Sequence, residues 1–109
     1  MEKIVIVGAG GFGREVKMLI DQINNINNKY EFLGFYDDAF QKGTIINHNK
    51  VIGSIDDLVN IEYKINVIVA IGSPDIKRKI VKKLTNPLIN FPTLIHPNVI
   101  IGNEFVSIG

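Results

Sequence analysis

The sequence predicts an α/β fold in which a mostly parallel sheet is flanked by helices. Two short apolar runs, residues 4–7 and 66–72, are rich in β-branched residues and meet glycine at their ends, which is typical of central parallel strands. Each run is followed by a segment with apolar residues at helical spacing. Strands and helices that alternate at these lengths predict βαβ units with right-handed crossovers.

The first half of the chain is expected to hold one long helix between two strands. The apolar stripe of this helix ends where an asparagine-rich stretch, residues 24–28, stops the pattern. Its members are Val16, Leu19, Ile20 and Ile23. An aromatic-rich strand over residues 31–36 follows and ends at Asp37 and Asp38. Two carboxylates therefore stand at the C-terminal end of the second strand.

The middle of the chain has a weaker pattern. Residues 39–50 are mostly polar and without periodicity, which predicts a surface loop. Residues 51–53 are followed by a short helix near 55–59. Ser54 and Asp57 have the spacing of a capping box, with Asp in place of the usual Glu or Gln.

The second half opens with the strand at 66–72 and a helix introduced by Ser73 and Pro74, a capping residue before a proline at the first helical position. The expected apolar stripe of this helix is Ile76, Ile80, Val81 and Leu84, with Lys77 and its basic neighbours on a solvated face. After Pro87 the sequence is extended and punctuated by proline, and no helical pattern returns.

Composition excludes several functions. At 109 residues, with 46% hydrophobic and 21% charged residues, the chain has the balance of one folded domain. Its net charge of +1 makes nucleic acid an unfavourable partner, and the lack of cysteine removes thiol chemistry. We find neither a membrane-spanning segment nor a signal peptide, so the protein is expected in the cytoplasm, with no membrane contact. No His, Asp and Glu spacing resembles a metal site.

The motif with the clearest chemistry is the glycine-rich turn Gly8-x-Gly10-x-x-Gly13, which follows the first strand directly and opens a helix. In this context the first glycine permits the turn, the second lets a phosphate approach the backbone, and the third packs helix on strand. Amides at the helix N-terminus then face the anion. The motif predicts a Rossmann-like domain that binds a phosphate, and leaves open whether NAD, a flavin nucleotide or a nucleotide sugar carries it.

Asp37 lies 24 residues after Gly13, close to the offset at which an acidic residue meets a ribose hydroxyl in dinucleotide sites. Asp38 stands beside it. A carboxylate here can accept hydrogen bonds from a ribose or from a base. The other interpretation is a turn aspartate that caps the following loop.

Several motifs together resemble a known family. The segments 8–15, 34–38, 51–53, 69–72 and 91–97, which include Gly-Gly-Phe-Gly-Arg-Glu and a later His-Pro, closely resemble the N-terminal half of sugar acyltransferases of the sialic acid O-acetyltransferase (NeuD/PglD) type. The resemblance implies a Rossmann-like nucleotide-sugar-binding domain over 1–90. It also implies that 91–109 is a linker and the start of a left-handed β-helix of hexapeptide repeats.

The resemblance also implies a site and its partners. The substrate-binding residues would be Gly8, Gly10, Gly11, Phe12, Gly13, Arg14, Asp37, Asp38, Gly72 and Ser73. The substrate would be a UDP- or CMP-linked amino sugar or sialic acid, with acetyl-CoA as co-substrate, and the full-length protein would be a homotrimer. A sugar amine or hydroxyl would attack the thioester.

The tail fits this view through its spacing. Ile95 and Ile101 are six residues apart, as are Val99 and Phe105, although Ile108 departs from this period. In the family the catalytic histidine lies within the β-helix, beyond residue 109. We therefore expect no catalytic residue in this chain, which would bind substrate without transferring an acyl group and could be a monomer. His96 and His48 are interpreted as structural and solvated.

Two other functions remain open at this point. The glycine motif alone would favour an NAD-dependent oxidoreductase or epimerase, but the sequence contains no Tyr-x-x-x-Lys pair. A nonenzymatic nucleotide-sensing domain is the other rival, and nucleotide binding independent of a second domain would favour it.

Overall fold

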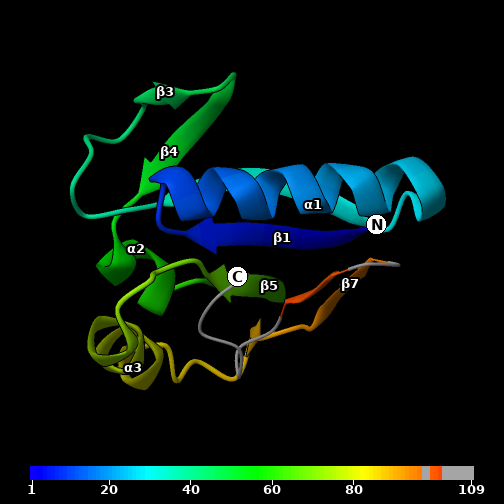
Figure 1. Ribbon diagram of the computed structural model, residues 1–109. Coiled ribbons are helices and arrows are strands. Elements are labelled where there is room, and N and C mark those ends of the chain that lie inside the picture. Colours follow the sequence, from blue (N-terminus) through cyan, green and yellow to red (C-terminus); the bar gives the residue numbers. More distant parts are fainter. Residues whose placement is uncertain (97–98, 102–109) are drawn as a thin grey trace.

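A six-stranded sheet organises the computed structural model (Figure 1), which describes residues 1–96 and 99–101, with side chains described for 1–94. The strands are β1 (Glu2–Val7), β2 (Tyr30–Tyr36), β3 (Ile45–Ile46), β4 (Asn49–Gly53), β5 (Ile65–Val69) and β6 (Ile89–Asn90), and a separate pair is β7 (Leu94–His96) and β8 (Val99–Ile101). The helices are α1 (Gly11–Asn27), α2 (Ile55–Val59) and α3 (Pro74–Lys83).

The sheet has the strand order β3-β4-β2-β1-β5-β6, and every pair except β3–β4 is parallel. If only the parallel strands are numbered along the chain, this order is 3-2-1-4-5, the order of the Rossmann fold. The predicted Rossmann-like α/β class is confirmed. The order reverses between β1 and β5, so the carboxyl ends of these two strands flank the crevice where such folds bind ligands.

Alternate residues of β1 build two separate cores. Ile4 and Ile6 pack with the predicted stripe of α1, whereas Val5 and Val7 pack on the opposite face with residues of α2 and α3. All four are at most 1% exposed, so β1 is buried on both faces, as its β-branched run predicts. In Figure 1, α1 covers one face of the sheet while α2 and α3 lie beyond the other.

The ends of the helices follow from their caps. Asn28, in the left-handed conformation with φ of 32°, closes α1 and donates its backbone N–H to the Asn24 carbonyl. The capping box of α2 is confirmed: the Ser54 hydroxyl accepts from the Asp57 amide, and the Asp57 carboxylate accepts from the Ser54 amide. These bonds to the Ser54 backbone and side chain lower the pKa of Asp57. Asp can thus replace Glu at this position.

Two expectations for the elements were wrong. The polar stretch 39–50 is not entirely loop, because it contains β3 and the start of β4, joined by Asn47 and His48. Both turn residues have positive φ, as a tight hairpin turn with right-handed twist requires, and the sequence lacks the Asn-Gly signal that would have revealed it.

The second error concerns the face of α3. Ile76, expected in the apolar stripe, is 50% exposed, whereas Lys77 is only 5% exposed. The face toward the sheet runs through residues 77, 80 and 84, and the long methylene stem of lysine allows it to occupy a buried position. Burial lowers the pKa of Lys77.

The domain boundary at 90/91 stays a prediction. Leu94 in β7 is fully buried and belongs to the same core as α1, so residues beyond 90 contribute to the α/β core. β7 pairs with β8 in antiparallel register. The hexapeptide spacing that reaches Phe105 and Ile108 lies outside the described residues.

Candidate functional site

The glycine-rich turn joins β1 to α1 at the carboxyl edge of the sheet. Gly8 has φ of +106°, a conformation that favours glycine, and a Cβ on it would lie 2.6 Å from the Ala70 carbonyl oxygen. Its N–H donates to the Tyr36 carbonyl over 2.9 Å. Gly8 is thus wedged between the ends of β2 and β5, and no larger residue fits there.

Gly13 provides the close packing of helix on strand. A Cβ at this position would lie 1.8 Å from the Gly8 carbonyl oxygen and 3.5 Å from the Phe35 ring. The first turn of α1 therefore rests directly on the backbone of the turn that precedes it. This contact has the geometry that the third glycine of the motif predicts.

Gly10 and Gly11 differ from these two glycines, because a Cβ at either position would meet no atom within 4 Å among the described residues. Glycine here is therefore not required by internal packing. Gly10 is the N-cap residue of α1 and provides no side-chain cap, and the first helical bond runs from the Arg14 N–H to the Gly10 carbonyl. The amides of residues 11–13 precede that bond and can serve an anion.

The structure brings Asp37 to this turn but gives its carboxylate structural partners. Its Oδ2 accepts from the Ala9 N–H over 2.8 Å, and its Oδ1 accepts from the Ala39 N–H over 2.8 Å. The carboxylate fastens the end of β2 to the glycine turn. Each oxygen still has a lone pair that could accept a hydrogen bond from a nucleoside. This role of Asp37 stays a prediction.

Asp38 points to a different element. Its Oδ1 accepts from the Ile55 N–H over 2.9 Å, so it caps the start of α2. This bond joins the end of β2 to α2, whereas the Asp37 bond to the Ala39 N–H is the one that fits a turn aspartate capping the following loop. The nucleoside contact predicted for Asp38 stays untested.

The opposite wall of the site follows β5. The Ala70 N–H donates to the Val7 carbonyl over 2.8 Å, which holds the end of β5 beside the glycine turn. A Cβ on Gly72 would meet no atom within 4 Å in the described part of the chain, and the Ser73 hydroxyl accepts from the Ile76 N–H at the start of α3. Gly72 and Ser73 thus follow the strand that flanks Gly8, whereas the Ser73 hydroxyl is used as a helix cap.

The remaining predicted site residues lie in the first turn of α1. Phe12 is half-buried and packs against the core beneath α1, while Arg14 is exposed. Within the described residues, the Arg14 guanidinium makes neither a hydrogen bond nor an ion pair. It can therefore turn toward a ligand without breaking an internal contact.

A pocket that sequence reasoning missed lies beside this turn. It measures about 120 Å³ and is lined by Arg14, Lys17, Met18, Asp21, Phe35, Asn47 and Asn49. The tip of the β3–β4 hairpin forms one of its walls. The sequence contained no signal for this wall, because the hairpin itself was interpreted as loop.

A larger, open hollow of about 620 Å³ lies at the other edge of the sheet, near Lys3, Tyr63 and Asn66. It surrounds the amino ends of β1 and β5. Ligand crevices of doubly wound sheets lie outside the carboxyl ends, so the glycine turn is the stronger candidate. Within the described residues no cluster of His, Asp and Glu could hold a metal ion, and no helix is long and apolar enough to cross a membrane.

Fold and turn together define a Rossmann-like domain with a glycine-rich loop between its first strand and first helix. The chain belongs to the PglD N-terminal domain family, whose model matches residues 3–84. This result confirms the family that the motifs resemble. A search among curated proteins found no match.

Among solved structures, the chain is similar to the acetyltransferase domain of PglB from Neisseria gonorrhoeae FA1090, in complex with acetyl coenzyme A. The TM-score is 0.71 and the identity is 31%, over 88% of this chain and 44% of that chain. The chain thus spans less than half the length of this relative. This similarity agrees with the assignment of the chain to the PglD N-terminal domain family.

Proposed function

We propose that this chain binds the nucleotide part of an activated sugar for a bacterial acetyltransferase. The observation that carries the proposal is the glycine turn, in which Gly8 and Gly13 are required by close backbone contacts while Gly10 and Gly11 are not. Glycine at the two open positions leaves room for a phosphate beside the first amides of α1. Binding at this point would hold the sugar diphosphate or monophosphate at the carboxyl edge of β1.

The chemistry proposed for the whole enzyme is acyl transfer from acetyl-CoA. An amine or hydroxyl of a UDP- or CMP-linked amino sugar or sialic acid would attack the thioester carbonyl, forming an amide or ester, while the thiol of CoA leaves. The similarity to a structure in complex with acetyl coenzyme A supports this co-substrate. This chain covers 44% of that relative. We propose that the transfer step depends on a part of the enzyme that corresponds to the rest of the relative.

The family resemblance also supports proposals about the assembly and location of the whole enzyme and about what the chain does alone. The full-length protein would act as a homotrimer in the cytoplasm, where nucleotide sugars for polysaccharide synthesis are made. The chain alone would bind substrate but not transfer the acyl group, and it could be monomeric.

Calorimetric titration at fixed salt tests the binding function. The chain would be titrated with UDP, CMP, UDP-N-acetylhexosamine and NAD, and the same ligands would be applied to Gly10→Val. Binding of the UDP or CMP species by the wild type and its loss in Gly10→Val are expected. Because a Cβ at Gly10 meets open space, the variant should keep its fold, which thermal unfolding would check.

An NAD-binding domain is the second candidate, and one observation favours it. Asp37 lies at the C-terminal end of β2, where an acidic residue contacts the ribose in dinucleotide sites. Its two carboxylate oxygens are already held by the Ala9 and Ala39 amides, which weakens the argument. Binding of NAD without UDP or CMP species would replace the nucleotide-sugar proposal with this one.

A further inference from the structure

We propose that the small pocket between α1 and the tip of the β3–β4 hairpin is an oxyanion subsite, formed by Arg14, Asn47 and Asn49. The subsite would hold either the second phosphate of a nucleoside diphosphate or the carboxylate of an acidic sugar. This inference rests on the proposed nucleotide-sugar function and names a group of that substrate.

The size of the pocket suits a single group of a larger ligand. Its volume of about 120 Å³ lies well below the roughly 300–1,000 Å³ of pockets that enclose a whole small molecule. A phosphate or carboxylate group can enter it while the rest of the ligand stays at the glycine turn.

Arg14 connects the pocket to that turn, because it lines the pocket and follows the last glycine of the motif. Arg14 directly follows Gly13, and its N–H makes the first helical bond of α1 with Gly10. Phe35 forms part of the pocket wall, and its ring is also the side chain nearest to a Cβ built on Gly13. Helical side chains lean toward the N-terminus of their helix, so the Arg14 guanidinium can cover the turn where the first phosphate would bind.

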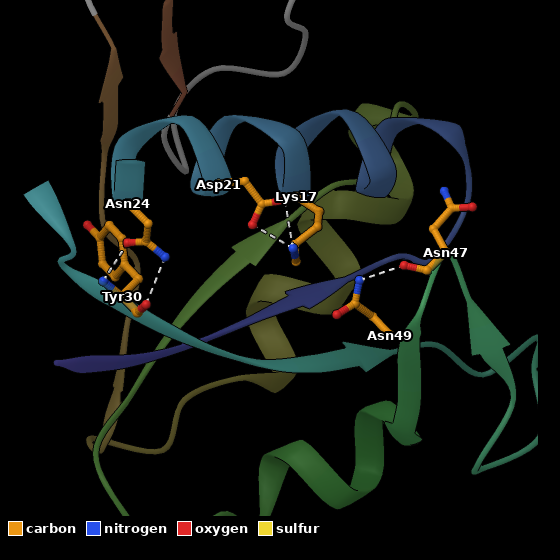
Figure 2. A network of polar contacts seen from close by, with 6 residues as sticks. All are labelled: Lys17, Asp21, Asn24, Tyr30, Asn47 and Asn49. Atoms are coloured by element: carbon orange, nitrogen blue, oxygen red, sulfur yellow. Dashed lines mark hydrogen bonds and ion pairs between the residues drawn. The ribbon is translucent and has the colours of Figure 1, made fainter. Parts of the chain in front are cut away.

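The polar groups of the pocket favour an anion. Lys17 is neutralised by Asp21, since the Lys17 Nζ lies 2.6 Å and 2.8 Å from the two carboxylate oxygens. Figure 2 shows this pair on the middle of α1. The Arg14 guanidinium, which has no such partner among the described residues, then supplies the uncompensated positive charge. A guanidinium and an oxyanion make charge-assisted hydrogen bonds, often in pairs.

The hairpin tip supplies amide donors opposite this charge. The Asn49 Nδ2 donates to the Asn47 carbonyl over 3.0 Å, which orders the tip. In the described part of the chain the Asn47 side chain has no hydrogen-bond partner, and in Figure 2 it extends from the hairpin turn toward the first turn of α1. The left-handed conformation of Asn47, with φ of 46°, holds it in that turn.

Calorimetry on four proteins tests the subsite: wild type, Arg14→Gln, Asn47→Ala and Arg78→Gln. Arg78 is the matched control, because it is the other arginine of the chain and lies on α3, across the sheet, paired with Asp75. The ligand pairs are UMP with UDP, and CMP with CMP-linked sialic acid. The first pair differs by the second phosphate alone. The second pair differs by the whole sialic acid residue, so the loss of its preference in Arg14→Gln assigns the effect to the carboxylate.

The expected result is a preference of about tenfold or more for UDP over UMP, or for CMP-sialic acid over CMP, in the wild type and in Arg78→Gln. In Arg14→Gln and Asn47→Ala this preference should fall at least severalfold. The pair that shows the effect identifies the oxyanion. Equal affinity within both pairs, or an unchanged preference in both variants, would overturn the subsite while leaving the nucleotide function standing.

A second measurement keeps the two proposals apart if no nucleotide binds. Pyrophosphate would be added to the ¹⁵N-labelled chain while the side-chain amide signals of Asn47 and Asn49 and the Arg14 Nε–H signal are followed. Shifts that saturate, and that are lost in Arg14→Gln but retained in Arg78→Gln, support the subsite. Absence of saturating shifts at these three groups would overturn it.

Discussion

Individual residues of the glycine turn have separable roles. Gly8 and Gly13 are required by close backbone contacts, whereas a Cβ on Gly10 or Gly11 would meet no atom of the described residues within 4 Å. If the proposed function holds, the motif combines a folding requirement with a binding requirement at adjacent positions. Stability and ligand affinity should respond to different glycines.

Gly13→Ala should destabilise the domain by at least about 3 kcal/mol, because its Cβ would lie 1.8 Å from the Gly8 carbonyl oxygen. Gly11→Ala should be neutral or should stabilise by up to about 1 kcal/mol, since alanine favours the helix and its Cβ meets no neighbour. Urea unfolding of both variants measures the difference. Equal losses would show that the first turn of α1 does not rest on Gly8 as described.

Asp37 should matter to folding before any ligand is considered. Asp37→Ala removes the acceptor for the Ala9 and Ala39 amides and should cost about 1–3 kcal/mol. Asp37→Asn keeps one acceptor oxygen and should lose less. Chemical denaturation without nucleotide checks the order of the two variants, and an unchanged Asp37→Ala would leave ligand binding as the main role of this residue.

Among the elements, β7 shows that the α/β core extends beyond the predicted boundary at residue 90. The sequence places the change of pattern after Pro87, yet Leu94 in β7 is fully buried with the α1 core. The proline-punctuated segment after Pro87 carries no periodic signal that would place Leu94 in the core. The packing of α1 therefore depends on a residue outside the predicted 1–90 range.

Leu94→Ala should cost about 2–5 kcal/mol, the loss typical of a leucine removed from a closed core. Ile76→Ala is the matched control, because Ile76 is 50% exposed and its loss should stay below about 1 kcal/mol. Thermal unfolding of the two variants compares them. Similar stabilities would contradict both the burial of β7 and the assigned face of α3.

For the molecule as a whole, one buried tyrosine links stability to alkaline pH. Tyr36 is 5% exposed, and its burial, followed by the electrostatic effect of Tyr63 and then of Asp57, raises its pKa to about 12 from 10.0. The folded state thus holds this proton more strongly than the unfolded state does. The resulting stability is fully present below pH 10 and is lost as the pH rises from 10 toward 12.

Tyr36→Phe should remove this part of the pH dependence. Between pH 9 and 11.5 the free energy of unfolding should fall more steeply for the wild type than for the variant, as measured in urea. A spectrophotometric titration should also show one of the three tyrosines ionising near pH 12. Parallel pH profiles for the two proteins would contradict the raised pKa.

The sequence by itself determined the α/β class, the buried strands β1 and β5, the caps of α2 and α3, and the glycine-rich turn between β1 and α1. These features depend on local rules: β-branched runs, helical periodicity, capping residues and the spacing of glycines. Each can be recognised from a few neighbouring residues. The family followed from several such motifs taken together.

Only the tertiary structure decided which side chains meet. Asp37 was predicted at the site, but its bonds to the Ala9 and Ala39 amides depend on how β2 ends beside the glycine turn. The hairpin tip at Asn47 faces Arg14 because β4 lies beyond β2 in the sheet, a relation of residues far apart in sequence. Sequence periodicity indicates whether a segment is a helix or a strand. Which of its side chains are buried, and which line a pocket, depends on the other elements that pack against that segment.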